Sequence, residues 1–528
     1  MRRPAFATAL ALASALLALL ARPRPAQAFC GFYAGSAGAA LYNHATQVVL
    51  LRDGLRTVLS MQNDYEGPPD RFAIVIPVPV VLGKDNVRTL SRELFERVDQ
   101  IDAPRLVEYW EADPCRPSDP YGYEFTDDPL AAGGFGPNDA TIRVRPGPVR
   151  VHDRFTVGEY EIVILGADDS LGLDAWLRAH GYGIPPGAET ALRPYVAAGM
   201  KFFVARVDPR RVRFSGNKAL LSPLRFHYDA ETFALPIRLG LLSSPGEQDL
   251  IVHVLARGQR YEVANYDNVA IPTNLDVNQN AKAQLGAFYA ALFDRSRQAS
   301  PGSVVTEYSW DAETCDPCPT PPLDEADLRA LGADVAPSLH ERPEGIPMGF
   351  VLTRLHARYD KRSLGADLVF RAAPPIAGGR EVRARAGAPL EPGASPSAQN
   401  NFQARYVVRH PWPGSVDCPS PKYGVWGADP QRGAAPPLAA ERAGDAPHGA
   451  VDLASFLGQP PPDTIALSHR WLLPEALPVP QARSGCAGCR AAGDDDSTPG
   501  LAASIALLAA ATARASRRRR TRPTSAPR

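Results

Sequence analysis

The sequence lacks an excess of charge of either sign, and it has very little lysine. Its 528 residues carry 57 basic and 57 acidic side chains, and only six of the basic ones are lysine. A neutral chain has no overall electrostatic attraction for nucleic acids or acidic membranes, so we expect no nucleic-acid partner. The arginines are dispersed among acidic residues, which favours codon bias over phosphate binding; their longest run is Arg517 to Arg520.

The common catalytic and cofactor motifs are missing as well. The chain has no His-Glu-x-x-His, Gly-x-Ser-x-Gly, Walker or Gly-x-Gly-x-x-Gly motif in a usable context. Its ten histidines are scattered, and His152, His227 and His253 fall in strand-like stretches, where core or surface positions are the default. We therefore assign no catalytic residue, no cofactor and no metal ligand from the sequence.

The start of the chain has the pattern of a secretory signal peptide. A basic start precedes an Ala/Leu-rich run over residues 5–20, and a small-x-small cleavage site ends at Ala28. We predict that residues 1–28 engage the export machinery and are removed by signal peptidase. Cys30 leaves a lipoprotein open as the lesser alternative, because Phe29 is larger than the small residue that precedes a lipoprotein cysteine.

The end of the chain predicts a membrane-sorting tail over residues 484–528. Cys486 and Cys489 precede an uncharged Ala/Leu run at 501–513 and then the cluster Arg517 to Arg520. Such a cluster holds the C-terminus on the cytoplasmic side. A helix of this length spans roughly 20 Å, which is short of a hydrocarbon core of about 30 Å. The tail therefore predicts transient tethering or a surface-lying helix more than a permanent span.

Between the two ends the sequence predicts an α+β protein. Its sheets are expected to be β-rich, mixed or antiparallel, with a few packed helices. Asp53-Gly54 between two apolar runs is a strong hairpin signal. Strands are expected at 46–52, 55–62, 72–79, 155–165, 200–207, 233–241, 250–256, 350–359, 401–410 and 465–473, and helices at 90–101, 170–180, 188–198 and 285–292.

Composition divides the exported region into parts. An α+β core is expected at 29–300, in which a faint repeat leaves open two related lobes at 29–130 and 140–300. A second β-rich part follows at 301–426, and a Pro/Ala/Gly-rich linker occupies 427–483.

The cysteines of an exported protein are expected to form disulfides. The candidates are Cys30, Cys115, Cys315, Cys318 and Cys418. We predict that Cys30 pairs with Cys115, since both border the first lobe, and that Cys315 pairs with Cys318 or that this pair engages Cys418. Zinc and redox alternatives for Cys315-x-x-Cys318 are less favoured, because the Pro-rich setting supplies neither four ligands nor a helix N-terminus.

Three further constellations have a structural and a functional interpretation. A spaced Asn/Asp series could open a calcium loop, but its missing glycine and glutamate favour a helix cap. An Asp pair could act in a cleft or cap a helix, and an aromatic set could line a groove or pack in a core. These constellations are Asn274, Asp276, Asn278 and Asn280; Asp168 and Asp169; and Tyr109, Trp110 and Trp412.

Several segments resemble a known family when they are taken together. They are FCGFYAG (29–35), the run at 46–80, APRLVEYWEADPC (103–115), the run at 155–177 and NNFQARYVVRHPW (400–412). Over about residues 29–425 the chain resembles an uncharacterised family of exported, largely myxobacterial proteins to which no reaction is assigned. The tail resembles the myxobacterial C-terminal sorting domain, and that resemblance implies a sorting protease acting at Cys486 or Cys489.

Together these expectations describe a surface-displayed protein of the cell envelope. It would be tethered to the inner membrane through 501–513, transiently or permanently, and would have a structural role or bind an envelope ligand that the sequence does not identify. The alternative is an extracytoplasmic hydrolase whose catalytic site assembles from distant segments.

Overall fold

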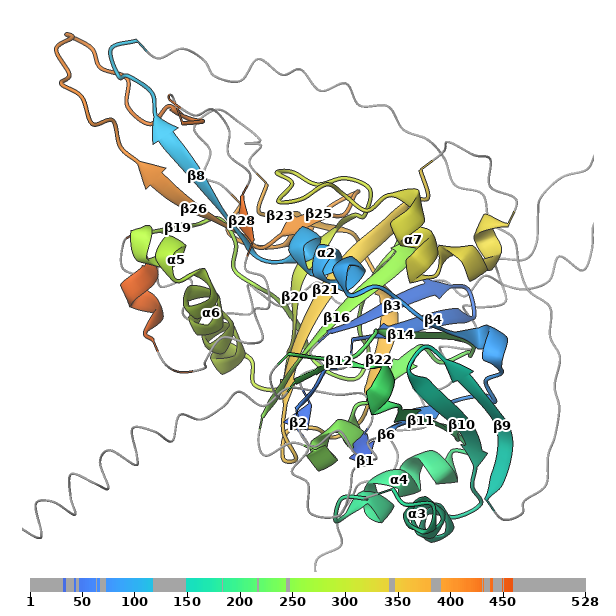
Figure 1. Ribbon diagram of the computed structural model, residues 1–528. Helices are drawn as coiled ribbons and strands as arrows, with labels where there is room; N and C mark the ends of the chain where they lie inside the picture. Colours follow the sequence, from blue (N-terminus) through green and yellow to red (C-terminus); the bar gives the residue numbers. More distant parts are fainter. Residues whose placement is uncertain are drawn as a thin grey trace, which may run out of the picture. The chain divides into compact units, whose positions relative to one another are not determined.

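The structure is a computed structural model (Figure 1). It describes residues 32–34, 42–43, 47–62, 64–66, 73–116, 149–182, 184–215, 218–243, 247–340, 347–380, 391–429, 431, 437–439, 449 and 451–458. The predicted signal peptide, Cys30, the strand expected at 465–473 and the tail at 484–528 lie outside these residues. None of the helices within the described ranges is long and apolar enough to cross a membrane.

The largest sheet combines strands from distant parts of the sequence. Its strands are β3 (Gln47–Asp53), β4 (Arg56–Met61), β7 (Val87–Thr89), β14 (Leu224–Asp229), β16 (Gln248–Arg257), β18 (Asn268–Ala270), β20 (Val304–Asp311), β21 (Phe350–Tyr359), β23 (Ile376–Gly378), β24 (Ser395–Pro396) and β25 (Asn401–Gln403). Their order is β24-β23-β25-β20-β21-β16-β3-β4-β14-β7, with β18 beside β20. The sheet is mixed, because β16 pairs in parallel with β3 and antiparallel with β21.

A second sheet packs against one face of this central sheet. Its order is β1 (Phe32–Ala34), β6 (Ala73–Val78), β11 (Lys201–Val207), β10 (Tyr160–Gly166) and β9 (Arg150–Val157). The two facing surfaces share one hydrophobic cluster, to which β3 contributes Leu50, β6 contributes Ile76 and β11 contributes Phe203. Strand alternation explains this cluster, since every second side chain of each strand points into the same space.

Helices cover the outer faces of both sheets. The helices are α2 (Arg92–Asp102), α3 (Ser170–Ala179), α4 (Ala188–Ala197), α5 (Gln279–Ala283), α6 (Leu285–Ala299) and α7 (Glu325–Leu331). Leu173 of α3 and Leu192 of α4 pack on the second sheet, whereas Phe95 of α2 and Leu328 of α7 pack on the central sheet. The order of layers is therefore helix, sheet, sheet, helix, as Figure 1 shows.

A smaller sheet extends away from these layers, at the upper left of Figure 1. It consists of β19 (Leu275–Val277), β26 (Arg405–His410), β8 (Arg105–Glu111) and β27 (Trp426–Gly427), with β28 (Leu438–Ala439) also beside β8. One face of β8 and β26 packs on α6, where Tyr406 meets Phe288 edge to face.

The remaining elements are short. Two small sheets have the orders β12 (Arg213–Ser215), β13 (Lys218–Leu220), β5 (Asp64–Glu66), β2 (Tyr42–Asn43), and β15 (Ala234–Leu235), β22 (Leu368–Ala373), β17 (Arg260–Val263). The 3-10 turns are η1 (Lys84–Asn86), η2 (Pro209–Arg211), η3 (Arg238–Ser243), η4 (Ala333–Val335), η5 (Pro337–Leu339) and η7 (Leu453–Phe456).

The α+β class and most of the predicted elements are confirmed. The hairpin at Asp53-Gly54 joins β3 to β4, and Gly54 adopts the positive φ of +58° that such a turn favours. The helix expected at 90–101 is α2, which spans Arg92–Asp102. Pro77 pairs with Phe202 of β11, and among the described residues the pairing of β6 with β1 ends at Val75, two residues before the proline.

Three predictions of strands need correction. The stretch 155–165 is not one strand but the end of β9, a turn at Gly158 and Glu159, and most of β10, which pairs antiparallel with β9. The stretch 233–241 forms only the two-residue strand β15 and then the turn η3, because its apolar residues fill the core between the sheets from an irregular backbone. The stretch 401–410 is two strands in two different sheets, with Ala404 between them. Hydrophobic content alone does not distinguish these cases from a single strand.

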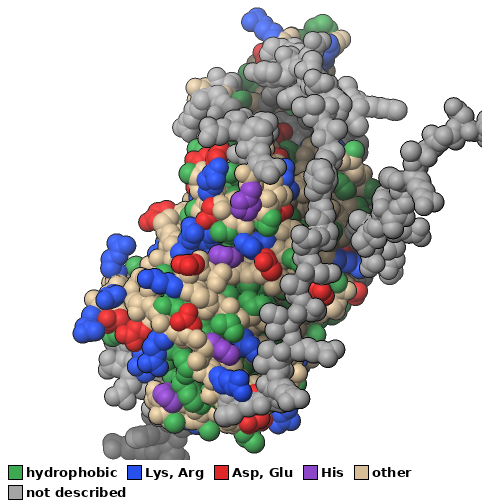
Figure 2. Space-filling model, turned by 90° about the vertical axis from the view of Figure 1, so that its right-hand side faces the viewer, with side chains coloured by type: hydrophobic (Ala, Val, Ile, Leu, Met, Phe, Trp, Pro, Cys, Tyr) green, Lys and Arg blue, Asp and Glu red, His purple; other side chains and the backbone are tan. Residues whose placement is uncertain are grey.

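The surface agrees with the neutral composition. On the face shown in Figure 2, the described basic and acidic side chains are interspersed, and no broad patch of one sign gathers there.

Candidate functional site: a buried network of charged side chains

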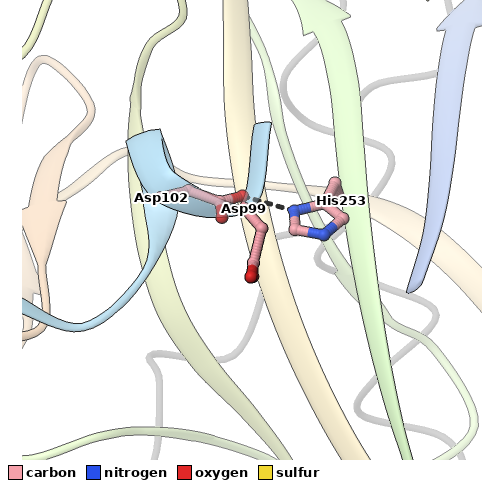
Figure 3. Close-up of side chains that lie close together, drawn as sticks. All are labelled: Asp99, Asp102 and His253. Carbon is pink, nitrogen blue, oxygen red and sulfur yellow. Dashed lines mark hydrogen bonds and ion pairs between the residues drawn. The ribbon is translucent and has the colours of Figure 1, made fainter. Parts of the chain in front are cut away.

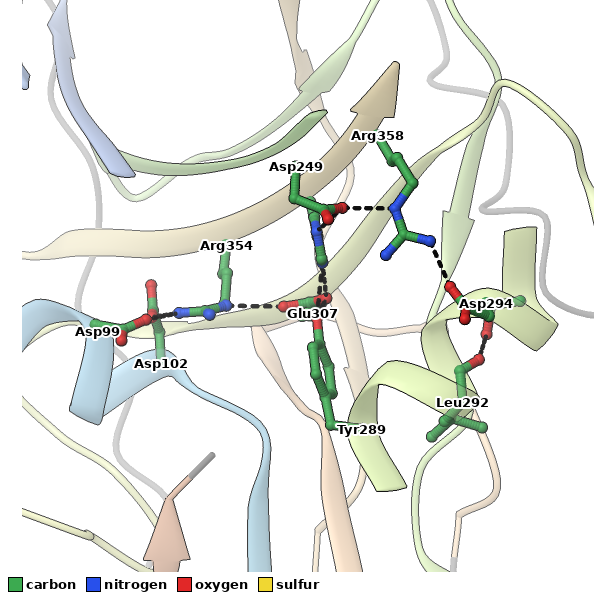
Figure 4. Close-up of polar contacts among 11 residues, drawn as sticks. Asp99, Asp102, Asp249, Tyr289, Leu292, Asp294, Glu307, Arg354 and Arg358 are labelled. Carbon is green, nitrogen blue, oxygen red and sulfur yellow. Dashed lines mark hydrogen bonds and ion pairs between the residues drawn. The ribbon is translucent and has the colours of Figure 1, made fainter. Parts of the chain in front are cut away.

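A large cluster of charged side chains lies inside the described part of the protein, on the face of the central sheet that α2 and α6 cover. Asp249 and His253 of β16, with Arg354, His356 and Arg358 of β21, occupy alternate strand positions, so all five point to this face. The intervening residues point into the core between the two sheets; they include Leu250, Val252, Leu355 and Ala357. We call this cluster, together with its partners Asp99, Asp102, Tyr289, Asp294 and Glu307, the buried charge network (Figure 4).

A β-bulge brings Glu307 into the network. In the pairing of β20 with β21, Thr306 lies opposite Leu355 and Tyr308 lies opposite Arg354, so Glu307 is an extra residue without a partner in the register. A bulge of this kind re-aims a side chain. As a result Glu307 and Tyr308, although adjacent in sequence, both face the helices.

Helix α2 supplies the two aspartates at one end of the network. Ser91 caps the helix by accepting a hydrogen bond from the Leu94 N–H, and Pro104 follows its end. Asp99 and Asp102 are three residues apart and therefore lie on one face of the helix. Both are buried, with exposed fractions of 2% and 0%.

Arg354 is the centre of the network. Its Nη1 donates to Asp99 Oδ1 at 2.6 Å and to Asp102 Oδ1 at 2.7 Å, while its Nε donates to Glu307 Oε2 at 2.7 Å. The side chain is fully buried. Although burial opposes ionisation, the charges of Asp99, Asp102 and Glu307 raise the pKa of Arg354 well above its ordinary value. One guanidinium thus connects helix α2 to two strands.

His356 is held between two carboxylates. Its Nε2 lies 2.9 Å from Asp249 Oδ1, and its Nδ1 lies 3.0 Å from Glu307 Oε1 and 2.8 Å from the Tyr289 hydroxyl. A neutral imidazole has only one N–H, so donating on both sides requires the charged form. Burial alone would lower the pKa of His356, but the charge of Glu307 and the hydrogen bonds to Asp249 and Glu307 raise it.

The opposite end of the network reaches helix α6. Arg358 Nε donates to Asp249 Oδ1 at 2.8 Å, and its Nη1 donates to Asp294 Oδ1. Phe293 stacks on the His356 ring at a centroid distance of 3.7 Å and also lies 4.8 Å from the Arg358 guanidinium carbon. An aromatic face stabilises cations placed over it, in agreement with a charged His356.

Asp99, Asp102 and His253 form the group in the described structure that could hold a metal ion (Figure 3). One ligand atom from each lies within 4.8 Å of the others, and His253 Nδ1 lies 2.6 Å from Asp102 Oδ2. Arg354 donates to both aspartates, however, so a guanidinium already supplies the positive charge there. We therefore assign the arrangement to ion pairing.

The buried charge network holds helices α2 and α6 on the central sheet. Its carboxylates are engaged by arginine or histidine, and the side chains of Arg354, Glu307 and Asp102 have no exposed surface. Removing one partner from such a buried pair leaves an uncompensated charge and is strongly destabilising. The network therefore specifies how α2 and α6 sit on the central sheet.

The structure corrects one of the predicted disulfides. Cys115 pairs with Cys418, not with Cys30, at a Cα–Cα distance of 5.6 Å. The reason is that β8 and β26 run in parallel with Arg105 opposite Arg405, so the chain segments that leave them emerge side by side. The local alternative for the other pair is confirmed, since Cys315 bonds Cys318.

The capping interpretations are confirmed. Asp169 accepts a hydrogen bond from the Gly172 N–H at the start of α3, and Asp168 beside it is exposed. Asn278 caps α5 in the same way, whereas Asp276 pairs with Arg409 at 2.6 Å. These residues act locally and do not join the buried charge network.

The aromatic candidates and the three strand histidines lie in different environments. Tyr109 is buried, Trp110 stacks on His410 at 4.4 Å, and Trp412 is partly exposed on the loop that follows β26. Of the three strand histidines, only His253 belongs to the network; its Nε2 has no hydrogen-bond partner within the described residues.

Sequence reasoning missed the network itself. The signal was present in β21, where FVLTRLHARY places Arg354, His356 and Arg358 at alternate positions of a strand that is otherwise hydrophobic. Charged residues at that period usually indicate a solvent-facing side. Only the presence of α2 and α6 over this face shows that it is buried.

Comparison with known proteins gives a family but no activity. No curated protein and no solved structure matches the chain. The model of a family described as "Uncharacterized protein conserved in bacteria (DUF2330)" matches residues 24–371, which is well over half of the chain and includes the whole buried charge network. The chain therefore belongs to the uncharacterised bacterial family DUF2330.

Proposed function

We propose that this protein is exported to the bacterial cell envelope and displayed at the cell surface, where it has a structural or ligand-binding role. The observation that carries the proposal is the Cys115–Cys418 disulfide, which joins residues 303 positions apart. Such bonds persist in oxidising compartments and are rare in the reducing cytosol. The signal-peptide pattern of residues 1–28 supports the same location.

The buried charge network supports a scaffold role over catalysis. Catalytic acids and bases must reach a substrate, but the carboxylates around Arg354 are enclosed and already paired. We propose that the network holds α2 and α6 rigidly, so that surfaces built on this frame keep a fixed shape.

The tail completes the proposal. The resemblance to myxobacterial sorting tails implies that a membrane-embedded protease processes the chain at Cys486 or Cys489, with residues 501–513 holding the chain in the inner membrane until then.

Fractionation combined with non-reducing peptide mapping tests the proposal. Full chain made in its own host is expected in the envelope fraction with Cys115–Cys418 oxidised. A variant lacking residues 2–28 is the matched control and is expected in the cytoplasm with reduced thiols. Wild-type protein found only in the cytoplasm would contradict the proposal.

One observation favours the alternative, an extracytoplasmic hydrolase. His253 donates from Nδ1 to Asp102, and its Nε2 has no partner within the described residues, which is the arrangement of a general base. His253 has no exposed surface, so a substrate would reach it only if α2 moved. Hydrolysis of ester or peptide substrates that the His253→Gln variant loses while remaining folded would favour this alternative.

A further inference from the structure

Two fully buried arginines lie side by side where the central sheet meets the smaller sheet. Arg105 of β8 and Arg405 of β26 are opposite each other in a parallel pairing, and each has an exposed fraction of 0%. Residues in register on neighbouring strands point to the same face, and their backbones are about 4.8 Å apart. The two guanidinium groups therefore share one side of the sheet.

Within the described residues, neither arginine is paired with a carboxylate. Arg105 donates from Nη1 to the Pro317 carbonyl at 2.8 Å and from Nη2 to the Ile101 carbonyl. Arg405 donates to the Gly379 carbonyl and the Tyr109 hydroxyl. The Nε of each has no hydrogen-bond partner within the described part of the chain.

The other arginines with an exposed fraction below 2% are paired. Arg354 has three carboxylates, Arg225 pairs with Asp334, and Arg260 pairs with Glu262 at 3.1 Å. These three fully buried guanidinium groups thus have acidic partners, whereas the adjacent pair has none within the described residues. Arg52, which is 7% exposed, also bonds only carbonyl and hydroxyl oxygens among the described residues.

Burial of the two guanidinium groups opposes their positive charge. Burial lowers the pKa of Arg105, Tyr308 and Asp102 oppose that effect, and the charge of Arg405 lowers it further. Asp102 does not neutralise Arg105, because it is already bonded to Arg354 and His253. Burying an ion without a counter-charge destabilises a protein, and here two such ions lie together.

We propose that Arg105 and Arg405 bind a small oxyanion, a phosphate or carboxylate group, that accepts from their Nε–H groups. Guanidinium groups suit such oxyanions because their N–H donors match the spacing of the oxygens. The inference goes beyond the proposed envelope role and does not depend on it.

One loop lies between this site and the surface. The loop of Cys315 and Cys318 covers Arg105, since the carbonyl of Pro317 accepts its hydrogen bond, while the neighbouring Asp316 is exposed. An anion that passes this loop would reach Arg105 directly.

Two measurements on the full chain test the proposal. Equilibrium dialysis with labelled inorganic phosphate is expected to show one saturable site. In urea unfolding at constant ionic strength, replacing chloride by phosphate should raise the folding equilibrium constant up to tenfold for each tenfold of phosphate above its Kd. Acetate is tested in parallel, and a response to acetate alone would identify the ligand as a carboxylate.

The variants separate this site from general salt effects, because phosphate stabilises many proteins by exclusion from their surfaces. Arg405→Met should lose the saturable site and, without an added anion, should be at least as stable as the wild type. Arg405→Lys keeps the charge but loses the planar set of N–H donors of the guanidinium group, and should weaken binding at least tenfold. Arg210→Gln, at an exposed arginine paired with Asp208, should bind like the wild type.

The proposal is overturned if the wild type binds neither phosphate nor acetate, or if Arg405→Met keeps the same saturable response. If the Arg405→Met variant does not fold, the dialysis of the wild type and of Arg405→Lys decides the question, because undiminished binding by Arg405→Lys would contradict the geometry.

Discussion

Arg354 donates from Nε to Glu307 across 2.7 Å, and neither side chain has any exposed surface. The bond joins β21 to the bulge of β20, and Nη1 of Arg354 reaches both aspartates of α2. This pair is therefore the point where helix and sheet are fixed to each other. Its properties give the most direct tests of the fold.

Replacing Glu307 by glutamine should lower the free energy of unfolding by about 3–5 kcal/mol, because the change leaves Arg354 and His356 short of a buried negative charge. Urea denaturation measures the loss. The control is Glu325→Gln, which removes an exposed pair with Arg329 and should cost about 0.3–0.5 kcal/mol. Similar losses of unfolding free energy in the two variants would show that the buried pair contributes no more to stability than the exposed one.

The charged His356 predicts a pH dependence on the alkaline side. Its pKa is raised in the folded state, so its contribution to stability is fully present below the unfolded value of about 6.5 and is lost as pH rises through the folded pKa. Unfolding free energies measured from pH 6 upward should show this fall in the wild type. The His356→Gln variant should lack that part of the slope, and an unchanged slope would mean that His356 is neutral when folded.

The two disulfides predict a specific pattern of variants. Cys115→Ser, Cys418→Ser and the double variant remove the same bond, so each should lower stability by about 2–5 kcal/mol and the two single losses should not add. Loss of Cys315–Cys318 should add to them, because it is a separate bond. Non-reducing peptide mapping checks the pairing, and a Cys30–Cys115 peptide would contradict the structure.

Gly379 should tolerate no side chain. It has a φ of +70°, and an added Cβ would lie 2.0 Å from the Gln403 carbonyl oxygen and 2.4 Å from Thr273 Oγ1. Gly379→Ala should therefore destabilise the protein far more than the about 1–2 kcal/mol that positive φ alone costs. Gly54→Ala is the matched control, since its φ is +58° with nothing within 4 Å of the added atom. Thermal unfolding compares the two, and equal shifts would refute the close approach at Gly379.

The tail predicts proteolytic processing. The acidic residues Asp494 to Asp496 should stay out of the hydrocarbon and leave Cys489 just outside the membrane, within reach of a processing enzyme. Surface protein is therefore expected to end near Cys486 or Cys489. Replacing both cysteines by alanine should leave an unprocessed form in the inner membrane. Intact mass is the measurement, and wild-type surface protein that retains Arg528 would refute processing.

Local patterns in the sequence were sufficient to predict many single elements. The hairpin at Asp53-Gly54, the ends of α2 and the cap at Asp169 depend on interactions within a few residues, so their signals are complete in the local sequence. Strand β21 was predicted with its bounds at Phe350 and Tyr359, because its residues are mostly hydrophobic and favour a strand. These elements also predicted the α+β class.

The tertiary structure decided which of these elements meet. Cys115 finds Cys418 only because β8 and β26 are parallel neighbours, and Glu307 faces Arg354 only because a bulge shifts the register of β20. Arg354 would be a solvent-facing residue if α2 did not cover it. Pairing between distant strands and the burial of a face depend on the whole chain, so no local pattern in the sequence specifies the buried charge network or the adjacent pair Arg105 and Arg405.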